Sequence, residues 1–149
     1  MKKNKSKYWE VGTHEIVEFY NSLQKEKDTF KLPLSKLLSS KIIIKEVVDR
    51  NLAAIAGIRK NGIIPISFIV VKSKFQGRGL GKILMSRLHK LAKDKYSFLI
   101  LSVMKENNQA IRLFKKCGYQ KLHKNKEIYF LIYPINIIGK LISKFSLLR

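Results

Sequence analysis

The sequence predicts an α/β fold of the α+β type, with a central mixed sheet that is mostly antiparallel and flanked by helices. Three apolar, β-branched runs follow one another between residues 41 and 71, and the short turn signals between them are typical of an antiparallel meander. A glycine-rich turn and a segment of helical periodicity then separate the third run from a fourth strand pattern. Such a crossover is right-handed and places its two strands parallel, which makes the sheet mixed.

Two helices are expected before the meander. Thr13 is a suitable N-cap for a helix from His14 to about Gln24, whose apolar residues recur on one face. A shorter helix is expected to start at Pro33, because proline is favoured at the first helical position. The three strands are expected at Lys41 to Val48, Leu52 to Arg59 and Ile63 to Val71, with turns at Asp49-Arg50-Asn51 and Asn61-Gly62.

The second half predicts two helices that alternate with strands. Leu80 to Lys93 has an apolar face and should be the crossover helix, leading to a strand at Phe98 to Val103. A second helix is expected from Asn107 to Cys117, where Gly118 ends it. A hairpin of Tyr119 to His123 and Glu127 to Tyr133 closes the sheet.

The segment after Pro134 predicts a separate basic amphipathic helix. Lys140 and Lys144 lie away from an apolar face made by Ile138, Leu141, Ile142, Phe145 and Leu148. We expect this face to pack on its own domain or on a second subunit, so the chain is a monomer or a homodimer. Peripheral contact with an anionic membrane is the alternative.

At 149 residues the chain is long enough for one main domain with a single core. We assign residues 1–9 to a basic arm, 10–134 to the main domain and 135–149 to the C-terminal helix. The basic N-terminus lacks the apolar segment of a secretory signal, and no apolar stretch is long enough to span a bilayer. The expected location is therefore the cytoplasm, with membrane-peripheral contact through the C-terminal helix as the alternative.

The chain is strongly basic, with 31 Lys and Arg residues against 10 Asp and Glu residues and a net charge of +21. A basic surface concentrates anions. We attribute most of the excess to genomic base composition, because the chain is rich in Lys, Ile and Asn together; a polyanionic macromolecular partner is the alternative. The single Cys117 excludes an intrachain disulfide, and neither His14 nor His89 has a second histidine or a cysteine one helical turn away, so no metal site is predicted.

The most informative segment is the glycine-rich turn at residues 76–82, which follows a strand and opens a helix. The N–H groups in the first turn of a helix have no intrahelical partner and carry partial positive charge. Glycines there remove the Cβ atoms that would hold a ligand's oxygens away from these amides, so the turn predicts a pyrophosphate site. The glycines are Gly77, Gly79 and Gly81, with Arg78 and Lys82 as cationic donors beside them.

The glycine spacing separates this turn from other phosphate-binding loops. No Gly-Lys-Ser/Thr closes it, which excludes a Walker P-loop, and Gly-x-Gly-x-Gly differs from the Gly-x-Gly-x-x-Gly of dinucleotide-binding folds. The turn resembles the acetyl-CoA loop of the GCN5-related N-acetyltransferases (GNAT). The Gln/Arg-x-x-Gly-x-Gly/Ala pattern of that family is matched by Gln76, Gly79 and Gly81.

A second signature of the GNAT family lies one helix and one strand further on. The family has Asn-x-x-Ala at the start of a helix that ends in an apolar-x-Gly-Tyr/Phe step. Here Asn107 and Ala110 match its start, and Gly118 and Tyr119 match its end. The resemblance covers roughly residues 10 to 134, most of the chain.

The resemblance implies the acyl-CoA N-acyltransferase fold, in which the two central parallel strands splay apart and the pantetheine arm of CoA inserts between them. It implies that the backbone of Ile69 to Val71 binds that arm, that an N–H at Ile69 holds the oxyanion, and that residues 77–82 bind the pyrophosphate. The implied acetyl-CoA-binding residues are Ile69, Val70, Val71, Gln76, Gly77, Arg78, Gly79, Leu80, Gly81, Lys82, Asn107, Ala110, Phe114 and Lys116.

The sequence departs from the family at the groups that move protons. Many relatives have a tyrosine in place of Phe114, and its hydroxyl protonates the departing thiolate. Many also have a glutamate base on the strand before the loop, where this chain has Pro65 to Phe68. The substitute candidates are Tyr119 and Tyr129 for the acid, and Glu46, Asp49 and His123 for the base.

The expected function is acetyl-CoA-dependent transfer of an acetyl group to a primary amine, by direct attack without an acyl-enzyme. A small anionic acceptor, such as a nucleotide-linked amino sugar, suits the basic surface, and a protein amine is the other candidate. Two alternatives stay open: a catalytically weak CoA-binding protein, and a basic nucleic-acid-binding module whose support is the charge alone. The acceptor site is expected to be lined by Phe19, Tyr20, Phe30 and residues 123–127.

Overall fold

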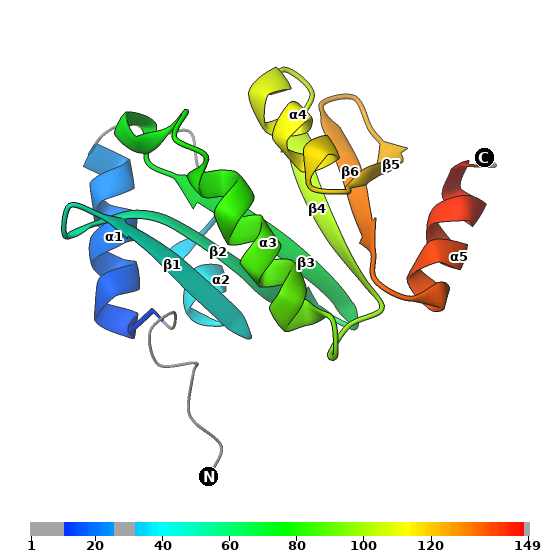
Figure 1. Ribbon diagram of the computed structural model, residues 1–149, viewed down its shortest axis with the longest axis horizontal. Helices are drawn as coiled ribbons and strands as arrows, with labels where there is room; N and C mark the ends of the chain where they lie inside the picture. Colours follow the sequence, from blue (N-terminus) through cyan, green and yellow to red (C-terminus); the bar gives the residue numbers. More distant parts are fainter. Residues whose placement is uncertain (1–10, 26–31, 148–149) are drawn as a thin grey trace, which may run out of the picture. The chain divides into compact units, whose positions relative to one another are not determined.

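The computed structural model describes residues 11–25 and 32–147 (Figure 1). The basic arm at residues 1–9, Phe30 of the predicted acceptor site and Leu148 of the C-terminal helix lie outside these ranges. The chain divides into two compact units, the first within Met1–Arg59 and Phe68–Leu84, the second within Lys60–Ser67 and Met85–Arg149. The division passes through three elements: β2 (Asn51–Asn61), β3 (Ile64–Val71) and α3 (Leu80–Ala92).

The strands form a six-stranded sheet in the order β1-β2-β3-β4-β6-β5. Antiparallel pairs join β1 to β2, β4 to β6 and β5 to β6, whereas β3 pairs with β4 in parallel, with Ile66 opposite Ile100. The predicted mixed sheet with flanking helices is therefore confirmed, and the predicted strands are observed to within one or two residues. The remaining strands are β1 (Ile42–Val48), β4 (Phe98–Met104), β5 (Gln120–Lys124) and β6 (Ile128–Pro134).

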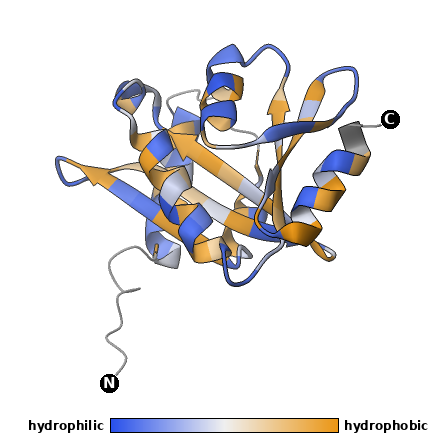
Figure 2. Cartoon of the chain, turned by 45° about the vertical axis from the view of Figure 1, so that its right-hand side comes forward, coloured by the Kyte–Doolittle hydropathy of each residue, from blue (hydrophilic) through white to orange (hydrophobic). Residues whose placement is uncertain are grey.

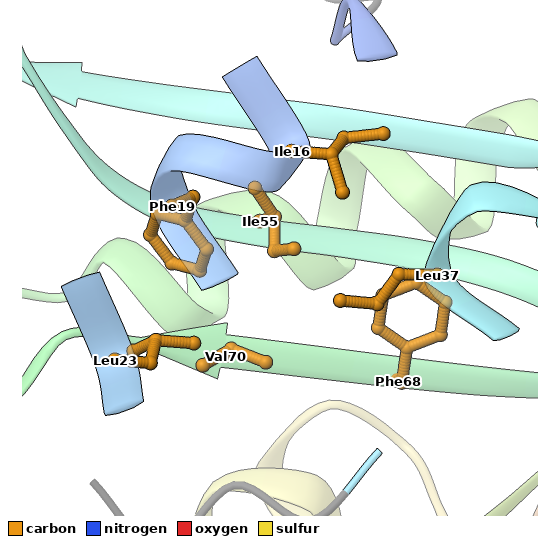
Figure 3. Packing of buried hydrophobic residues seen from close by; sticks show 7 residues of the cluster. All are labelled: Ile16, Phe19, Leu23, Leu37, Ile55, Phe68 and Val70. Atoms are coloured by element: carbon orange, nitrogen blue, oxygen red, sulfur yellow. The ribbon is translucent and has the colours of Figure 1, made fainter. Parts of the chain in front are cut away.

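The first unit buries the apolar faces of α1 (Thr13–Lys25) and α2 (Leu34–Leu38) against β2 and β3. Figure 3 shows side chains from both helices meeting those of the two strands in one cluster. The predicted cap at Thr13 is wrong by one residue, because the first helical bond runs from the Ile16 N–H to the Gly12 carbonyl. The cluster consists of Ile16, Phe19, Leu23, Leu37, Ile55, Phe68 and Val70.

Two turns of this fold require unusual backbone conformations. Asp49 and Arg50 connect β1 to β2 with φ values of 49° and 65°, which twists the chain as a tight antiparallel hairpin needs. Gly57 on β2 is required for a different reason. A Cβ there would overlap the backbone of Ile42 and the ring of Phe68, so only glycine allows this close packing.

The second unit contains β4 and β6 together with three helical segments. These are the part of α3 from Met85 onward, the whole of α4 (Asn108–Lys116) and α5 (Ile137–Leu147). The helix expected after Pro134 is present, but most of its apolar face does not pack on its own domain, which was one of the two expected arrangements. Ile138, Leu141 and Phe145 remain exposed, while Gly139 and Ser143 are buried. None of the helices in the described part of the chain has the length and hydrophobicity needed to cross a lipid bilayer.

Candidate functional site

The glycine-rich turn connects β3 to α3 within the first unit. A short 3-10 helix, η2 (Ser73–Phe75), follows β3, and the chain then passes through Gly77 and Gly79 with φ values of 77° and 78°. These values lie in the left-handed region, which L side chains enter at a cost. No atom lies within 4 Å of a Cβ built at either glycine, so conformation rather than crowding requires them, and the backbone stays open on that side.

Hydrogen bonds and a small apolar cluster hold the turn in place. The side-chain amide of Gln76 donates to the Val71 carbonyl at 3.1 Å, and the Lys72 N–H donates to the Ala53 carbonyl at 2.9 Å. Beneath the turn, Phe75 packs with Ala53 and Leu80 in a buried cluster. The backbone before the helix is thus anchored to β2 and β3 of the same unit.

The start of α3 presents unpaired donors beside this turn. The first intrahelical bond runs from the Ile83 N–H to the Gly79 carbonyl at 3.2 Å. The N–H groups of Leu80, Gly81 and Lys82 precede that bond and have no partner within the helix. No acidic residue occupies the first turn of α3, and the exposed cations Arg78 and Lys82 flank it. The arrangement is suited to an oxyanion with several oxygens, such as a pyrophosphate.

Two predicted base candidates lie in the same unit. Glu46 is half-buried on β1 beside a β-bulge, and Asp49 is exposed in the turn that follows. Val48, the residue before Asp49, packs against the cluster beneath the glycine turn. The structure therefore brings the β1–β2 turn next to the glycine turn, which strand spacing in the sequence does not reveal.

The second predicted motif starts α4 in the second unit. Asn107 is the N-cap of this helix, because its side-chain oxygen accepts a hydrogen bond from the Ala110 N–H at 3.1 Å. Phe114 is 5% exposed and belongs to the core, whereas Lys116 is exposed in the last turn. The spacing of Asn107 and Ala110 thus has a local structural use, the capping of α4.

The end of α4 positions Tyr119. Gly118 adopts a φ of 99°, and the chain closes the helix with bonds from the Gly118 N–H to the Lys115 carbonyl and from the Tyr119 N–H to the Phe114 carbonyl. This pair of bonds is a Schellman motif, which is often accompanied by an apolar contact across the helix end. Here that contact is the edge-to-face packing of Phe114 on Tyr119, with ring centroids 5.8 Å apart.

Tyr119 lies at the centre of a buried hydrogen-bond chain. Its hydroxyl is 2.8 Å from Ser67 Oγ on β3 and 3.2 Å from His89 Nε2 on α3. Ser67 in turn donates to the Ile100 carbonyl on β4 at 3.2 Å, so its oxygen accepts from Tyr119 and Tyr119 accepts from a protonated Nε2. The ring of His89 stacks on Tyr133 with centroids 3.6 Å apart.

Burial governs the ionisation of this chain of groups. It raises the pKa of Tyr119 well above that of an exposed phenol, because the phenolate would lose its hydration. It lowers the pKa of His89 from the usual 6.5 to about 4, because the imidazolium would also be poorly hydrated. The neutral groups thus form a directional chain of donors from His89 to the Ile100 carbonyl.

No sequence pattern predicts a role for Ser67 or His89. The one signal in the sequence is that each is a polar residue at an inward position of an apolar strand or helix. Their common hydrogen-bond partner, Tyr119, is identified only in the folded chain. The predicted site residues fall into both units. Those of β3 and the glycine turn lie in the first unit together with Glu46 and Asp49, and those of α4 lie in the second unit together with Tyr119. Within the described ranges, no group of three His, Cys, Asp or Glu residues is arranged to hold a metal ion.

Comparison with known proteins identifies a family and a fold. Residues 9–119 match the family model described as the acetyltransferase (GNAT) family. A search of curated proteins finds no match to the sequence. Solved structures with a similar overall fold do exist.

The ribosomal-protein-S18-alanine N-acetyltransferase from Escherichia coli has a TM-score of 0.69 at 18% identity, with 85% of this chain and 92% of that chain covered. An acetyltransferase of the GNAT family from Streptococcus pneumoniae has a TM-score of 0.68 at 20% identity, with 85% and 97% covered. The PaiA N-acetyltransferase from Thermoplasma acidophilum, in complex with coenzyme A, has a TM-score of 0.61 at 15% identity, with 78% of each chain covered. At these identities the likeness establishes the shared fold.

Proposed function

We propose, because this chain belongs to the acetyltransferase (GNAT) family, that it transfers the acetyl group of acetyl-CoA to a primary amine. The amine nitrogen attacks the thioester carbonyl directly, the carbon–sulfur bond breaks, and CoA leaves as a thiol after proton transfer. The observation that carries this proposal is the glycine turn, whose two left-handed glycines leave the start of α3 open to an anion.

The pyrophosphate of acetyl-CoA fits the donors at this turn. The N–H groups of residues 80–82 supply partial positive charge, and Arg78 and Lys82 supply full charges beside them. Gln76 takes part indirectly, because its side chain is bonded to the Val71 carbonyl and holds the turn. Gly77, Gly79 and Gly81 let the ligand approach the backbone closely.

The end of β3 is proposed to bind the pantetheine arm through its main chain. The Val70 side chain is buried in the core cluster, which fixes this segment, while Ile69 and Val71 are half-exposed. The Ile69 N–H is proposed to polarise the thioester carbonyl and to hold the developing oxyanion. The resemblance also implies CoA contacts for Asn107, Ala110, Phe114 and Lys116 of α4, and these stay predictions.

Proton transfer must use groups other than a tyrosine at position 114. Glu46 and Asp49 are the proposed bases, since both lie in the unit that contains the glycine turn. Burial raises the pKa of Tyr119, so its hydroxyl keeps its proton at neutral pH and can act only as a proton donor; it is hydrogen-bonded to Ser67 and His89. We therefore propose Tyr119 as the acid and a carboxylate as the base.

The proposed acceptor is a small anionic amine, such as a nucleotide-linked amino sugar, or a protein amine. The support for an anionic acceptor is the net charge of +21, which attracts anions and repels cationic amines. The support for a protein amine is the similar fold of the S18-alanine N-acetyltransferase. A CoA-binding protein with little turnover is the second candidate, favoured by the buried phenylalanine at position 114.

Isothermal titration of the full chain with acetyl-CoA, and in parallel with desulfo-CoA, tests the site. We expect one site per chain with a dissociation constant of about 10 μM or lower. Gly79→Asp should weaken binding by about 100-fold, because a carboxylate would face the pyrophosphate. Gly62→Asp is the matched control: Gly62 also has a positive φ, of 60°, and open space around its Cβ, but it lies in the β2–β3 hairpin.

The outcomes separate the candidate functions. Thiol release from acetyl-CoA in the presence of an anionic amino sugar or a peptide amine supports the transferase. Tight binding without thiol release for any amine class supports the CoA-binding protein. Absence of binding refutes the glycine-turn assignment, and salt-sensitive binding of nucleic acid would then become the leading hypothesis.

A further inference from the structure

The C-terminal helix α5 turns its small residues toward its own unit and its large apolar residues outward. Gly139 is buried, and a Cβ there would collide with the carbonyl oxygen of Ser97. Ser143, one turn later, is 5% exposed. Figure 2 shows apolar residues among the polar ones along the visible side of this helix. Four large apolar side chains point outward and are 50% to 75% exposed: Ile137, Ile138, Leu141 and Phe145.

Hydrogen bonds at the start of α5 hold this orientation. The Asn136 side-chain oxygen accepts from the N–H groups of Ile138 at 3.0 Å and Gly139 at 3.3 Å. Its amide nitrogen donates to Ser97 Oγ at 3.0 Å, and the Ile135 N–H donates to the Ser97 carbonyl at 2.8 Å. A rotation that buried the apolar side of α5 would break these bonds, so the helix is built to present that side.

A second exposed apolar pair lies at the same end of the strands. Ile63 is 93% exposed and Ile64 is 42% exposed, and together they form the end of the β2–β3 hairpin. Because β3 is parallel to β4, this end is level with Phe98, which is paired with Pro134 just before α5. Since β4 separates β3 from β6, the lateral distance between the hairpin end and the start of α5 is about 10 Å, at ~4.8 Å per strand.

Exposed lysines surround these apolar side chains. Lys60 lies in the hairpin, with its ammonium group 6.0 Å from the centroid of the Tyr96 ring. Tyrosine, with an apolar ring and a polar tip, is enriched at membrane interfaces. In the β2–β3 hairpin, the α3–β4 connection and the described part of α5, one exposed carboxylate, Asp94, stands against five exposed lysines: Lys60, Lys93, Lys95, Lys140 and Lys144.

We propose that this face of the second unit binds the surface of an anionic lipid bilayer. The apolar side chains would enter the boundary between headgroups and acyl chains, and the lysines would bind the anionic headgroups. A second copy of the chain fits less well, because an apolar contact between two such faces would bring ten lysines together on chains of charge +21. Nucleic acid also fits less well, because its phosphates bind the lysines but gain nothing from the exposed isoleucines. Binding of this face to a bilayer does not require acetyl transfer.

Co-sedimentation of the full chain with vesicles tests the proposal. We expect binding to vesicles of equal parts phosphatidylglycerol and phosphatidylcholine, none to phosphatidylcholine alone, and weaker binding as salt rises. Leu141→Ser with Phe145→Ser should weaken binding at least about tenfold, since both side chains would be buried in lipid. Its control is Val47→Ser with Ile83→Ser, which removes two comparably exposed apolar side chains from the first unit.

Two double variants that change charge test the role of the lysines. Lys140→Glu with Lys144→Glu should weaken binding by about 25-fold or more, at about fivefold per lysine. Lys36→Glu with Lys41→Glu makes the same change in net charge at exposed positions of the first unit and should have a much smaller effect. Circular dichroism and thermal unfolding would confirm that each variant is folded.

Three results would overturn the proposal. One is the absence of binding to the anionic vesicles. Another is an equal loss of binding in the first-unit controls, which would show a general effect of charge. The third is a dimer, seen by sedimentation velocity, that is lost in the Leu141→Ser, Phe145→Ser variant, because the face would then belong to a second copy.

Discussion

Mild acid should destabilise this protein through one half-buried histidine. His89 stacks on Tyr133, and its Nε2 lies 3.2 Å from the Tyr119 hydroxyl. Burial lowers its pKa from the usual 6.5 to about 4. The unfolded chain therefore takes up this proton near pH 6.5 and the folded chain only near pH 4, so the stability that is present above pH 6.5 falls as the pH drops through this interval.

The size of the effect follows from the same two pKa values. Linkage predicts a loss of about 2 kcal/mol at pH 5, and of ~3 kcal/mol at pH 4, relative to the stability above pH 6.5. The ring is only partly buried, and solvent reduces the penalty of charging it, so we expect about 1 kcal/mol at pH 5. That is a measurable fraction of the ~5–15 kcal/mol typical of a folded domain.

Urea unfolding at about pH 7 and pH 5 provides the assay. His89→Gln removes the titrating group but keeps an N–H that can reach the Tyr119 oxygen, so this variant should lose about 1 kcal/mol less than the wild type between the two pH values. His123→Gln, at an exposed position on β5, is the control and should behave as the wild type. An equal acid-induced loss in the wild type and His89→Gln would refute the reasoning.

Three further predictions concern the packing and the chemistry. Tyr119→Phe should cost about 1–3 kcal/mol of unfolding free energy, because it removes the hydrogen bond that Ser67 accepts and the acceptor of the His89 Nε2–H. Tyr129→Phe on half-buried β6 should cost less, and chemical denaturation checks both. Gly57→Ala should cost about 1–3 kcal/mol, measured in the same way, because its Cβ overlaps the Phe68 ring; a cost near zero would contradict the packing. Phe114→Tyr should raise kcat for acetyl transfer by about tenfold in steady-state assays if proton delivery to the thiolate limits the rate, and an unchanged kcat would show that this step is not limiting.

Much of the fold could be predicted because its signals are local. The strands and helices follow apolar periodicity, and the hairpin turns and helix ends follow the conformational preferences of their residues. Gly118 illustrates this: it follows the helical pattern in the sequence, and in the structure it ends α4 with a φ of 99°. The glycine turn belongs to the same class, since its geometry depends on residues that are neighbours in the chain.

The candidate proton-transfer groups could be only partly predicted. Tyr119 was recognisable from its motif, but its partners Ser67 and His89 lie on β3 and α3, 52 and 30 residues away in sequence. A serine in a strand and a histidine in a helix carry no pattern that pairs them. Their contact depends on the parallel alignment of β3 with β4 and on the packing of α3 against the tyrosine.

By itself, the sequence determined the order of elements, the open glycine turn and the amphipathic character of α5, because each depends on residues within a few positions of one another. The tertiary structure alone decided which side of α5 faces inward. Periodicity favours burial of Ile138, Leu141 and Phe145, yet Gly139 and Ser143 are inside. The physical reason is close approach: the backbone at Ser97 leaves space for a hydrogen atom at position 139 and for no larger side chain, and that constraint exists only once the strands have assembled.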